Sequence, residues 1–287
     1  MDYYYDCEFL EGTQKRRIGK IGLPKMFDTK NTIDLISIGI VDQEDREYYA
    51  VSKDFNLKEA WYRYDLVKDD SVGARLGILP PYRKVYWIRE NVLKPIFEDW
   101  CGSSDLNSLY VFNYKNFKNF LSIYGKTNKQ IAEKVYNFMN PDLGFHVSGY
   151  NNSELKEEGR LHNHFKLHNV TSNGECYYAQ PKLHGYYSSY DHVVFCWLFG
   201  KMKDLPKSFP MYTYDLKQMF DDKASKFHRN DFFTAFDFEG GDSSDMEDSK
   251  KIKHLKMHTA YPMKQNEHHS LSDAKWTKKL HEFLKRL

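Results

Sequence analysis

An aspartate and a glutamate interrupt an aromatic, strand-like run near the N-terminus. In "MDYYYDCEFLEG", Asp6 and Glu8 flank a single cysteine. Residues i and i+2 of a β-strand point to the same face, so the two carboxylates can converge on one cation. Burying two like charges there without a metal would be costly. The pair therefore indicates a metal site, and the competing interpretation is a solvent-exposed strand face.

The D-x-E spacing alone is weak support, because ordinary composition gives roughly one such triplet in a chain of this size. The sequence contains five, and the other four lie in polar segments: Asp42/Glu44, Asp45/Glu47, Asp237/Glu239 and Asp245/Glu247. Solvated surface charge is a sufficient explanation for those four. Only the first triplet falls inside an apolar strand.

Two further acids occur at predicted helix starts. Asp191 in "YYSSYDHVVF" would emerge near the carboxyl end of a predicted strand, where sites in α/β proteins form. Asp273 in "EHHSLSDAKW" lies in the first turn of the last predicted helix, and His268 precedes it by five residues. The alternatives are an N-cap for Asp191 and, for Asp273, compensation of the helix dipole, worth about 0.3–1 kcal/mol at a surface.

Four acids and a histidine are together suited to a recognisable chemistry. Two divalent ions about 3.5–4 Å apart need several shared carboxylates, and a neutral histidine can take the proton of an attacking water. Oxygen ligands favour hard ions such as Mg²⁺ or Mn²⁺.

An α/β sheet is the element that must position these residues. Apolar runs at Tyr3–Leu10, Thr32–Val41 and Glu47–Ser52 predict three consecutive strands. The second run is apolar on both faces, which is typical of a sheet covered on both sides. "PKLHGYYSS" predicts a fourth strand and "LPKSFPMY" a short fifth.

Helical spacing of apolar residues appears in four segments. "NKQIAEKVYNFM" has Thr127 or Asn128 as N-cap, and "YDHVVFCWLFG" stops at Gly200. "TYDLKQMFDD" and the amphipathic "SLSDAKWTKKLHEFLKRL" are the other two. In the second segment, the spacing predicts one buried face made of Val193, Val194, Trp197 and Leu198.

Five irregular polar stretches lie between these elements, at about 12–31, 62–85, 101–126, 140–180 and 223–262. Loops of this length are unusual in a compact domain, so we interpret them as insertions in one domain spanning 1–287. The fourth stretch contains His162, His164 and His168. Without a companion acid or cysteine pair, these histidines favour an ordinary exposed loop over a zinc site.

Composition limits the class of protein. The 287 residues include 42 Lys plus Arg and 40 Asp plus Glu, so no global charge indicates a nucleic-acid or membrane partner. The four cysteines form no C-x-x-C pair, which fits a reducing, intracellular setting. No run approaches the roughly 18 apolar residues of a membrane span. We expect a soluble, cytoplasmic protein without a membrane partner.

Several blocks of the sequence resemble, in order and spacing, the three exonuclease motifs of the DEDDh superfamily. They are "YYYDCEFLEG", "TIDLISIGIV", "REYYAVSKDF", "GYYSSYDHVVF" and "EHHSLSDAKW". The closest resemblance is to the mycobacterial-type 3′–5′ exoribonuclease family, whose members carry D-T-E-F, "DLISIG", "Y-A-V-S", "YDHV" and a terminal H-x-A-L-x-D-A. The resemblance implies a ribonuclease H-like fold, with a mixed five-stranded sheet flanked by helices.

The resemblance also implies a role for each site residue. The metal ligands it implies are Asp6, Glu8, Asp191 and Asp273, with His268 as general base. His269 is a rival base, but only His268 has the family spacing. Cys7 replaces the usual Thr, which would make the site sensitive to oxidation if the thiolate is accessible.

The implied activity is two-metal hydrolysis of RNA from its 3′ end, with two Mg²⁺ or Mn²⁺ ions as cofactors. One alternative is a DNA-directed or mixed-substrate 3′–5′ exonuclease, because the motifs define the chemistry and not the sugar. Others are a catalytically silent nucleic-acid-binding module and a metal phosphoesterase acting on small phosphate esters. RNA 3′ ends are the expected partner, and a homodimer is a reasonable expectation because several relatives pair.

Overall fold

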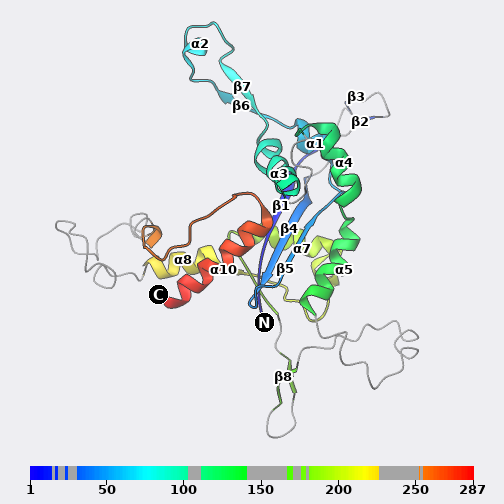
Figure 1. Ribbon diagram of the computed structural model, residues 1–287, viewed down its shortest axis with the longest axis vertical. Helices are drawn as coiled ribbons and strands as arrows, with labels where there is room; N and C mark the ends of the chain where they lie inside the picture. Colours follow the sequence, from blue (N-terminus) through cyan, green and yellow to red (C-terminus); the bar gives the residue numbers. More distant parts are fainter. Residues whose placement is uncertain are drawn as a thin grey trace, which may run out of the picture.

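A five-stranded sheet forms the centre of the computed structural model (Figure 1). The structure describes residues 1–14, 17–18, 23–24, 31–102, 111–140, 167–170, 176–178, 181–225, 252 and 255–287. The sheet has the order β11-β10-β1-β4-β5. Its strands are β1 (Asp2–Gly12), β4 (Thr32–Asp42), β5 (Glu47–Val51), β10 (Lys182–Gly185) and β11 (Tyr214–Asp215). Only β4 runs against the others, so the predicted mixed five-stranded α/β sheet is confirmed.

The fifth strand lies later in the chain than predicted. The expected segment "LPKSFPMY" contains Pro206 and Pro210, which cannot donate backbone hydrogen bonds to a sheet. Pairing begins only past this segment, where Tyr214 and Asp215 lie beside His184 and Gly185 of β10. The prediction was therefore right about a fifth strand and wrong about its position.

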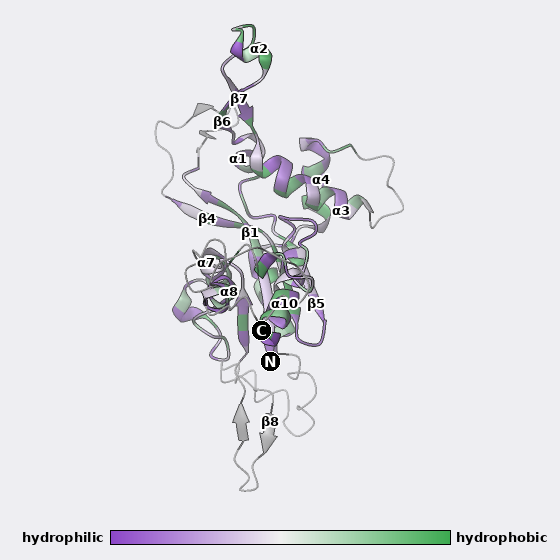
Figure 2. Cartoon of the chain, turned by 90° about the vertical axis from the view of Figure 1, so that its left-hand side faces the viewer, coloured by the Kyte–Doolittle hydropathy of each residue, from purple (hydrophilic) through white to green (hydrophobic). Residues whose placement is uncertain are grey.

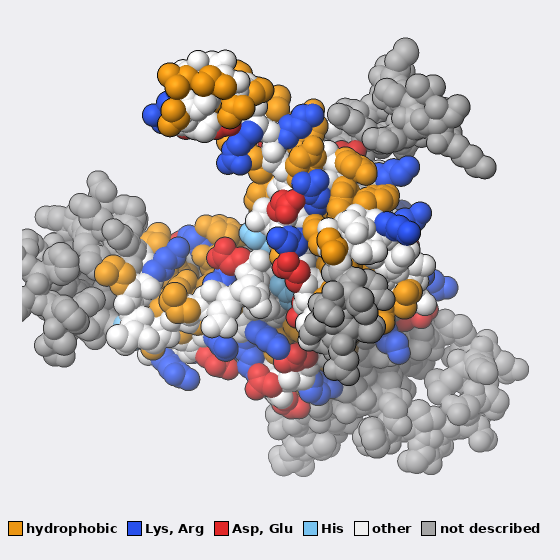
Figure 3. All heavy atoms as spheres, turned by 45° about the horizontal axis from the view of Figure 1, so that its top comes forward, with side chains coloured by type: hydrophobic (Ala, Val, Ile, Leu, Met, Phe, Trp, Pro, Cys, Tyr) orange, Lys and Arg blue, Asp and Glu red, His pale blue; other side chains and the backbone are white. Residues whose placement is uncertain are grey.

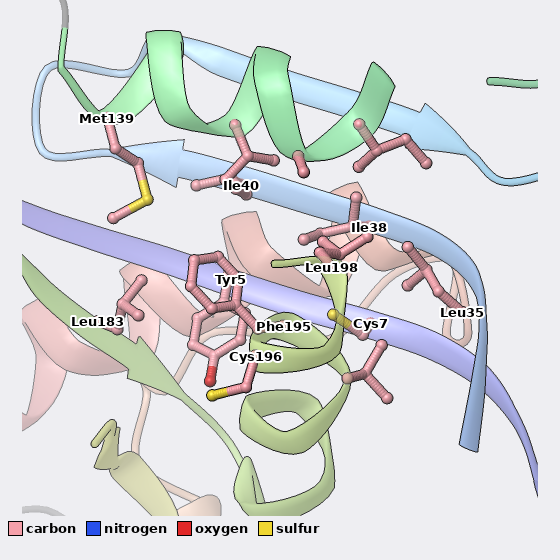
Figure 4. Close-up of a cluster of buried hydrophobic side chains, with 14 of the residues drawn as sticks. Tyr5, Cys7, Leu35, Ile38, Ile40, Met139, Leu183, Phe195, Cys196 and Leu198 are labelled. Atoms are coloured by element: carbon pink, nitrogen blue, oxygen red, sulfur yellow. The ribbon is translucent and has the colours of Figure 1, made fainter. Parts of the chain in front are cut away.

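Helices α5 (Asn128–Met139) and α7 (Ser189–Leu198) cover one face of the sheet. Figure 4 shows Tyr5 and Cys7 of β1 beside Phe195 and Cys196 of α7. A capping box with Thr127 as N-cap starts α5, as the sequence predicts.

The predicted buried face of α7 was half wrong. Val194 and Leu198 are buried, but Val193 and Trp197 lie at the surface. Phe195 takes their place in the core, because the side chains of β1 and α5 meet that side of the helix.

Helix α10 (Ser270–Arg286) lies on the opposite face of the sheet, beside α8 (Leu216–Ser225) (Figure 1). The two helices share a separate apolar cluster that includes Phe220, Trp276, Leu280 and Phe283. The turn between β4 and β5 holds α10 in place. Lys278 Nζ in the helix donates to the carbonyl oxygens of Asp42 and Gln43 at 3.1 and 3.0 Å.

A second helical group packs at the far end of β1 and β4. It consists of α1 (Leu57–Tyr62), the π-helical turn η1 (Arg89–Leu93), α3 (Lys94–Gly102) and α4 (Tyr114–Tyr124). Its core is rich in aromatic rings, including those of Trp61, Phe97, Phe117 and Phe120.

A hairpin projects from this helical group (Figures 1 and 2). It consists of β6 (Asp65–Lys68), β7 (Tyr82–Val85) and, between them, α2 (Val72–Arg75). Figure 2 shows apolar colouring at its tip, where Val72, Leu76 and Ile78 are exposed.

Two of the stretches expected to be irregular therefore contain regular structure. The hairpin occupies 62–85, and α4 occupies much of 101–126. All four residues of β6 are exposed, so this strand lacks the alternation by which strands are recognised. Helix α4 does carry helical spacing, at Phe117, Phe120 and Leu121, so the prediction of an irregular stretch was wrong there.

The remaining elements are short. They are the 3-10 turn η3 (Met202–Asp204) and two strand pairs, β2 (Arg17–Ile18) with β3 (Leu23–Pro24) and β8 (Leu167–Val170) with β9 (Cys176–Tyr178). The greater part of 12–31, 140–180 and 223–262 lies outside the described residues. Among the helices that the structure describes, none combines the length and the apolar character needed to cross a membrane.

A glycine lets the start of α10 rest directly on the sheet. A Cβ at Gly39 of β4 would lie 2.3 Å from the backbone nitrogen of Leu271 and 2.4 Å from its Cα. Beside this contact, the hydroxyls of Ser37 and Ser270 are hydrogen-bonded at 3.0 Å. Since both neighbours of Gly39 are backbone, any side chain there must displace the helix.

We expect Gly39→Ala to lower the free energy of unfolding by about 1–3 kcal/mol, the usual effect of overpacking a core. Urea unfolding followed by circular dichroism would measure the change. Gly102→Ala is the matched control, because a Cβ there meets nothing within 4 Å. Equal stability of the two variants would contradict the close contact between β4 and α10.

Candidate active site and metal centre

Strand β1 divides its side chains between two different environments. Tyr3, Tyr5 and Cys7 point into the apolar core under α5 and α7. The alternate residues face α10, and among them are Asp6 and Glu8. The structure therefore places the acidic pair on the buried, α10-facing side of the sheet and not on an open strand face.

Three of the four predicted acids converge. Carboxylate oxygens of Asp6, Glu8 and Asp273 lie within 4.8 Å of one another. Asp6 is partly buried, while Glu8 and Asp273 are 9% and 3% exposed. Asp273 reaches the strand because the first turn of α10 sits on Gly39, which is paired with Asp6. This cluster could hold a divalent cation.

Asp191, the fourth acid, is anchored to the backbone of β1. Strand β10 pairs with β1 only as far as Tyr4, so the strand beyond has a free edge on that side. The amide of Cys7 donates to Asp191 Oδ1 there at 2.8 Å. Asp191 is 7% exposed, and its charge raises the pKa of Asp6. One carboxylate oxygen of Asp191 thus accepts a hydrogen bond from β1, and the charge of Asp191 raises the pKa of Asp6.

The turn between β10 and α7 brings Asp191 to this position. A Cβ on Gly185 would lie 2.4 Å from Cβ of Ser188, so only glycine allows the chain to fold back so tightly. Tyr187, within the turn, has a left-handed backbone with φ of 56°. Asp191 follows in the first turn of α7, as the sequence predicts.

Crowding and burial raise the pKa of every acid in this group. Burial, followed by the charge of Asp191, raises the pKa of Asp6 well above its usual range. Burial and the charge of Asp273 raise the pKa of Glu8 to about 8. Burial raises the pKa of Asp191 to about 7, although the Cys7 amide opposes the rise. These carboxylates therefore resist ionisation unless a cation joins them.

Lys264 is a site residue that sequence reasoning missed. Its Nζ lies 3.1 Å from Asp273 Oδ1, and its charge opposes the rise in pKa of Asp6, Glu8 and Asp273. Figure 3 shows acidic side chains close to histidine and basic side chains near the centre of the visible face. No sequence signal marks Lys264, because it lies outside the helix and nine residues before its partner.

The two adjacent histidines have different environments. His268 is partly buried, and its amide donates to Asp273 Oδ2 at 3.1 Å. Its backbone is left-handed, with φ of 65°, and its ring meets that of Trp87 edge-on at 4.8 Å. The conformation is unfavourable for a non-glycine residue and is maintained by these contacts.

The contacts of His269 stabilise the fold and bury its ring. It is 6% exposed, its ring stacks on Tyr49, and its Nδ1 accepts from the Ser272 amide as N-cap of α10. Burial lowers its pKa. Of the two histidines, His268 is the better placed to meet a substrate.

Aromatic side chains flank the acids. Phe9, the residue after Glu8, contacts Tyr190 edge-on at 6.1 Å, and Tyr190 is 55% exposed. On the other side, Trp87 is 43% exposed beside His268. Exposed rings of this kind are suitable platforms for stacking nucleic-acid bases.

Two other sequence hypotheses concern reactive or metal-binding residues. Cys7 is buried among apolar side chains, and burial raises the pKa of its thiol. The accessible thiolate needed for ready oxidation is therefore missing. His162 and His164 lie outside the described residues, and of His168 only the backbone, in β8, is described.

Comparison with known proteins finds two distant relatives. They are the 3′–5′ exoribonucleases Rv2179c and MT2234.1 of Mycobacterium tuberculosis, from strains H37Rv and CDC 1551. Each is 23% identical over 228 residues, which cover 78% of this chain and 76% of the relative. No family model matches the chain. The similarity supports a relationship to 3′–5′ exoribonucleases.

The raised pKa values predict how stability depends on pH without metal. A carboxyl whose pKa is higher in the folded state stabilises fully below its unfolded pKa, near 4, and loses this contribution as pH rises through the folded pKa. With Glu8 at about 8 and Asp191 at about 7, chelator-treated protein should lose stability steadily from about pH 4.5 to 8. Thermal unfolding across this range measures the loss, which we expect to be a few kcal/mol in order of magnitude.

The matched control is Glu8→Gln, which cannot ionise and should flatten the slope. Added Mg²⁺ or Mn²⁺ should restore stability most strongly at pH 8, where the cation has fewest protons to displace. A stability profile that rises toward pH 8 in chelator would contradict the described electrostatics.

Proposed function

We propose that the chain is a metal-dependent 3′–5′ exoribonuclease of the DEDDh type, with a ribonuclease H-like fold. The observation that carries the proposal is the convergence of Asp6 and Glu8 with Asp273, more than 260 residues away in sequence. The exoribonuclease relatives support RNA as substrate and cleavage from the 3′ end. The mixed sheet flanked by helices is the architecture that the motif resemblance implies.

The acid cluster fits divalent ions. Its ligand atoms are carboxylate oxygens, which hard cations prefer, and its high pKa values reflect a negative field that a cation would relieve. We infer that the three acids of the cluster, together with Asp191, would hold two Mg²⁺ or Mn²⁺ ions. Bound there, such ions supply an activated water and offset the charge on the departing 3′ oxygen.

His268 is the proposed general base. A neutral imidazole can accept the proton of the attacking water, provided that its ring is held near the reacting phosphate. The hydrogen bond that the His268 amide donates to Asp273 and the ring contact with Trp87 restrain His268 beside the acids. His269 is unsuited to the role, because its Nδ1 caps α10 and its ring is enclosed by Tyr49.

The substrate end would be held by local contacts, since the net charge of +2 provides little long-range attraction. We propose that Trp87 and Tyr190 stack on the terminal bases on either side of the acids. Lys264, whose Nζ lies 3.1 Å from Asp273 Oδ1, is the basic side chain at the acids that would be available to substrate phosphate. The single-domain organisation, the homodimer and the cytoplasmic location stay predictions from the sequence.

The proposal is tested with 3′- and 5′-labelled RNA and DNA oligonucleotides in Mg²⁺, Mn²⁺ or chelator. We expect stepwise shortening of RNA from its 3′ end in either metal and none in chelator.

Asp6→Asn and Asp273→Asn should fold and lose activity. Asp221→Asn, at a surface ion pair of α8, should fold and keep its activity. DNA shortened as fast as RNA supports the mixed-substrate alternative. Metal-dependent hydrolysis in both active-site variants would refute the assignment.

For His268→Ala we expect the cleavage rate to fall about 10²- to 10⁴-fold, the usual contribution of a general base, while RNA binding is retained. Single-turnover cleavage and filter binding measure the two quantities. His192→Ala, in α7, is the histidine control. An unchanged rate in His268→Ala would transfer the role of base to another residue.

A further inference from the structure

A second cluster of potential metal ligands lies on the same face of the sheet as the acids. Ligand atoms of Asp2 in β1, His184 in β10 and His281 in α10 lie within 4.8 Å of one another. Both histidines are 5% exposed. Three elements distant in sequence thus bring two imidazoles and one carboxylate together.

The second cluster follows the same seam between β1 and α10 as the first. Asp6 lies four residues after Asp2 in the strand, a distance of about 13 Å. His281 lies eight residues after Asp273 in the helix, a rise of about 12 Å. Because the two spacings match, an antiparallel strand and helix bring together both pairs, Asp6 with Asp273 and Asp2 with His281.

The hydrogen bonds leave imidazole nitrogens available for coordination. Tyr4 Oη lies 3.0 Å from His281 Nδ1, which leaves Nε2 of His281 for a metal. Such a bond on the distal nitrogen is the usual way in which a metal-binding histidine is oriented. The rings of Tyr4 and Tyr214 stack on the imidazole of His184, each with a centroid distance of 5.2 Å, and fix its plane.

His184 has an unmet bonding requirement. Its Nε2 lies 3.2 Å from Asp2 Oδ1, and its Nδ1 is buried without a partner in the part of the chain that the structure describes. If Nε2 carries the proton, the Nδ1 lone pair is unused; if Nδ1 carries it, that donor is unused and Nε2 faces a carboxylate. No protonation state of the free ring satisfies both nitrogens.

We propose that Asp2, His184 and His281 bind one transition-metal ion of the Zn²⁺ class, which joins β1, β10 and α10. Two neutral imidazoles and a carboxylate suit such an ion far better than Mg²⁺. The site is chemically distinct from the all-carboxylate cluster. Its function is structural: it fixes the middle of the helix whose first turn carries Asp273. The proposal does not depend on the nuclease activity.

The competing arrangement is a metal-free ion pair between Asp2 and a protonated His184. Lys285, whose Nζ lies 3.5 Å from Asp2 Oδ2, provides a second positive charge. Burial and the neighbouring His184 lower the pKa of His281 to about 4, so His281 is neutral and offers a lone pair. The ion pair gives His281 no part in the cluster, whereas a metal ion bound to Asp2 would take the neighbouring Nε2 of His184 and one nitrogen of His281.

The test uses the full chain carrying Asp6→Asn and Asp273→Asn, so that the carboxylate cluster does not compete for the probe. Co²⁺, followed by its visible absorption, and Zn²⁺ in competition with it measure binding. We expect one equivalent of Zn²⁺, and a rise in the thermal midpoint on adding it. The double variant His184→Gln with His281→Gln should lose both the Zn²⁺ binding and the rise in thermal midpoint. His192→Gln is the matched histidine control.

Tyr4→Phe keeps all three ligands and removes only the hydrogen bond to His281. We expect it to fold and to bind Zn²⁺ about 10- to 100-fold more weakly, the usual effect of losing such a partner. This variant also answers the case in which the double histidine variant fails to fold. Zn²⁺ bound equally by the parent, Tyr4→Phe and Asp2→Asn, or bound by none of them, would overturn the proposal.

Discussion

Repulsion among buried carboxylates is the constraint on which the arrangement of this molecule depends. Asp6, Glu8 and Asp273 are held within 4.8 Å of one another at the base of a buried seam. Burial disfavours each charge, and each charge disfavours the others. The described structure offers partial relief through Lys264, at 3.1 Å from Asp273, and through the Cys7 amide, which stabilises the nearby Asp191. Keeping these groups in place requires a rigid frame, and a bound cation would relieve the remaining repulsion.

The seam between β1 and α10 provides that frame. Gly39 allows the backbone of Leu271 to touch the sheet, which sets the depth of the helix start. Lys278 fixes the helix about two turns further along, at the carbonyl oxygens of Asp42 and Gln43. With both ends of the contact held by backbone groups, the side chains between them have little freedom. The position of Asp273 relative to β1 is therefore a property of the fold and not of a flexible loop.

The sequence predicts the parts of this arrangement that have local signals. Strand alternation places Asp6 and Glu8 on one face, and the start of the last helix places Asp273 in its first turn. The close approach of α10 has no such signal, because Gly39 lies in an ordinary apolar strand and its requirement comes from a helix more than 200 residues later. Lys264 is equally hidden, since its contact depends on the path of the chain before α10. The hairpin at 62–85 was missed because its strands are exposed on both faces.

The electrostatics of the acids also distinguish a metal-binding site from a catalytically silent nucleic-acid-binding module. Asparagine or glutamine at Asp6 and Glu8 would preserve shape and hydrogen bonding and remove the buried charges, so a silent binding module would be more stable with the amides. The chain instead combines four acids with raised pKa values and a histidine in a left-handed conformation. Ionisation of these acids opposes folding unless a cation offsets the charge, and the conformation of His268 adds backbone strain. Their joint presence at one place favours a site that binds metal ions and acts through them over a scaffold that only holds nucleic acid.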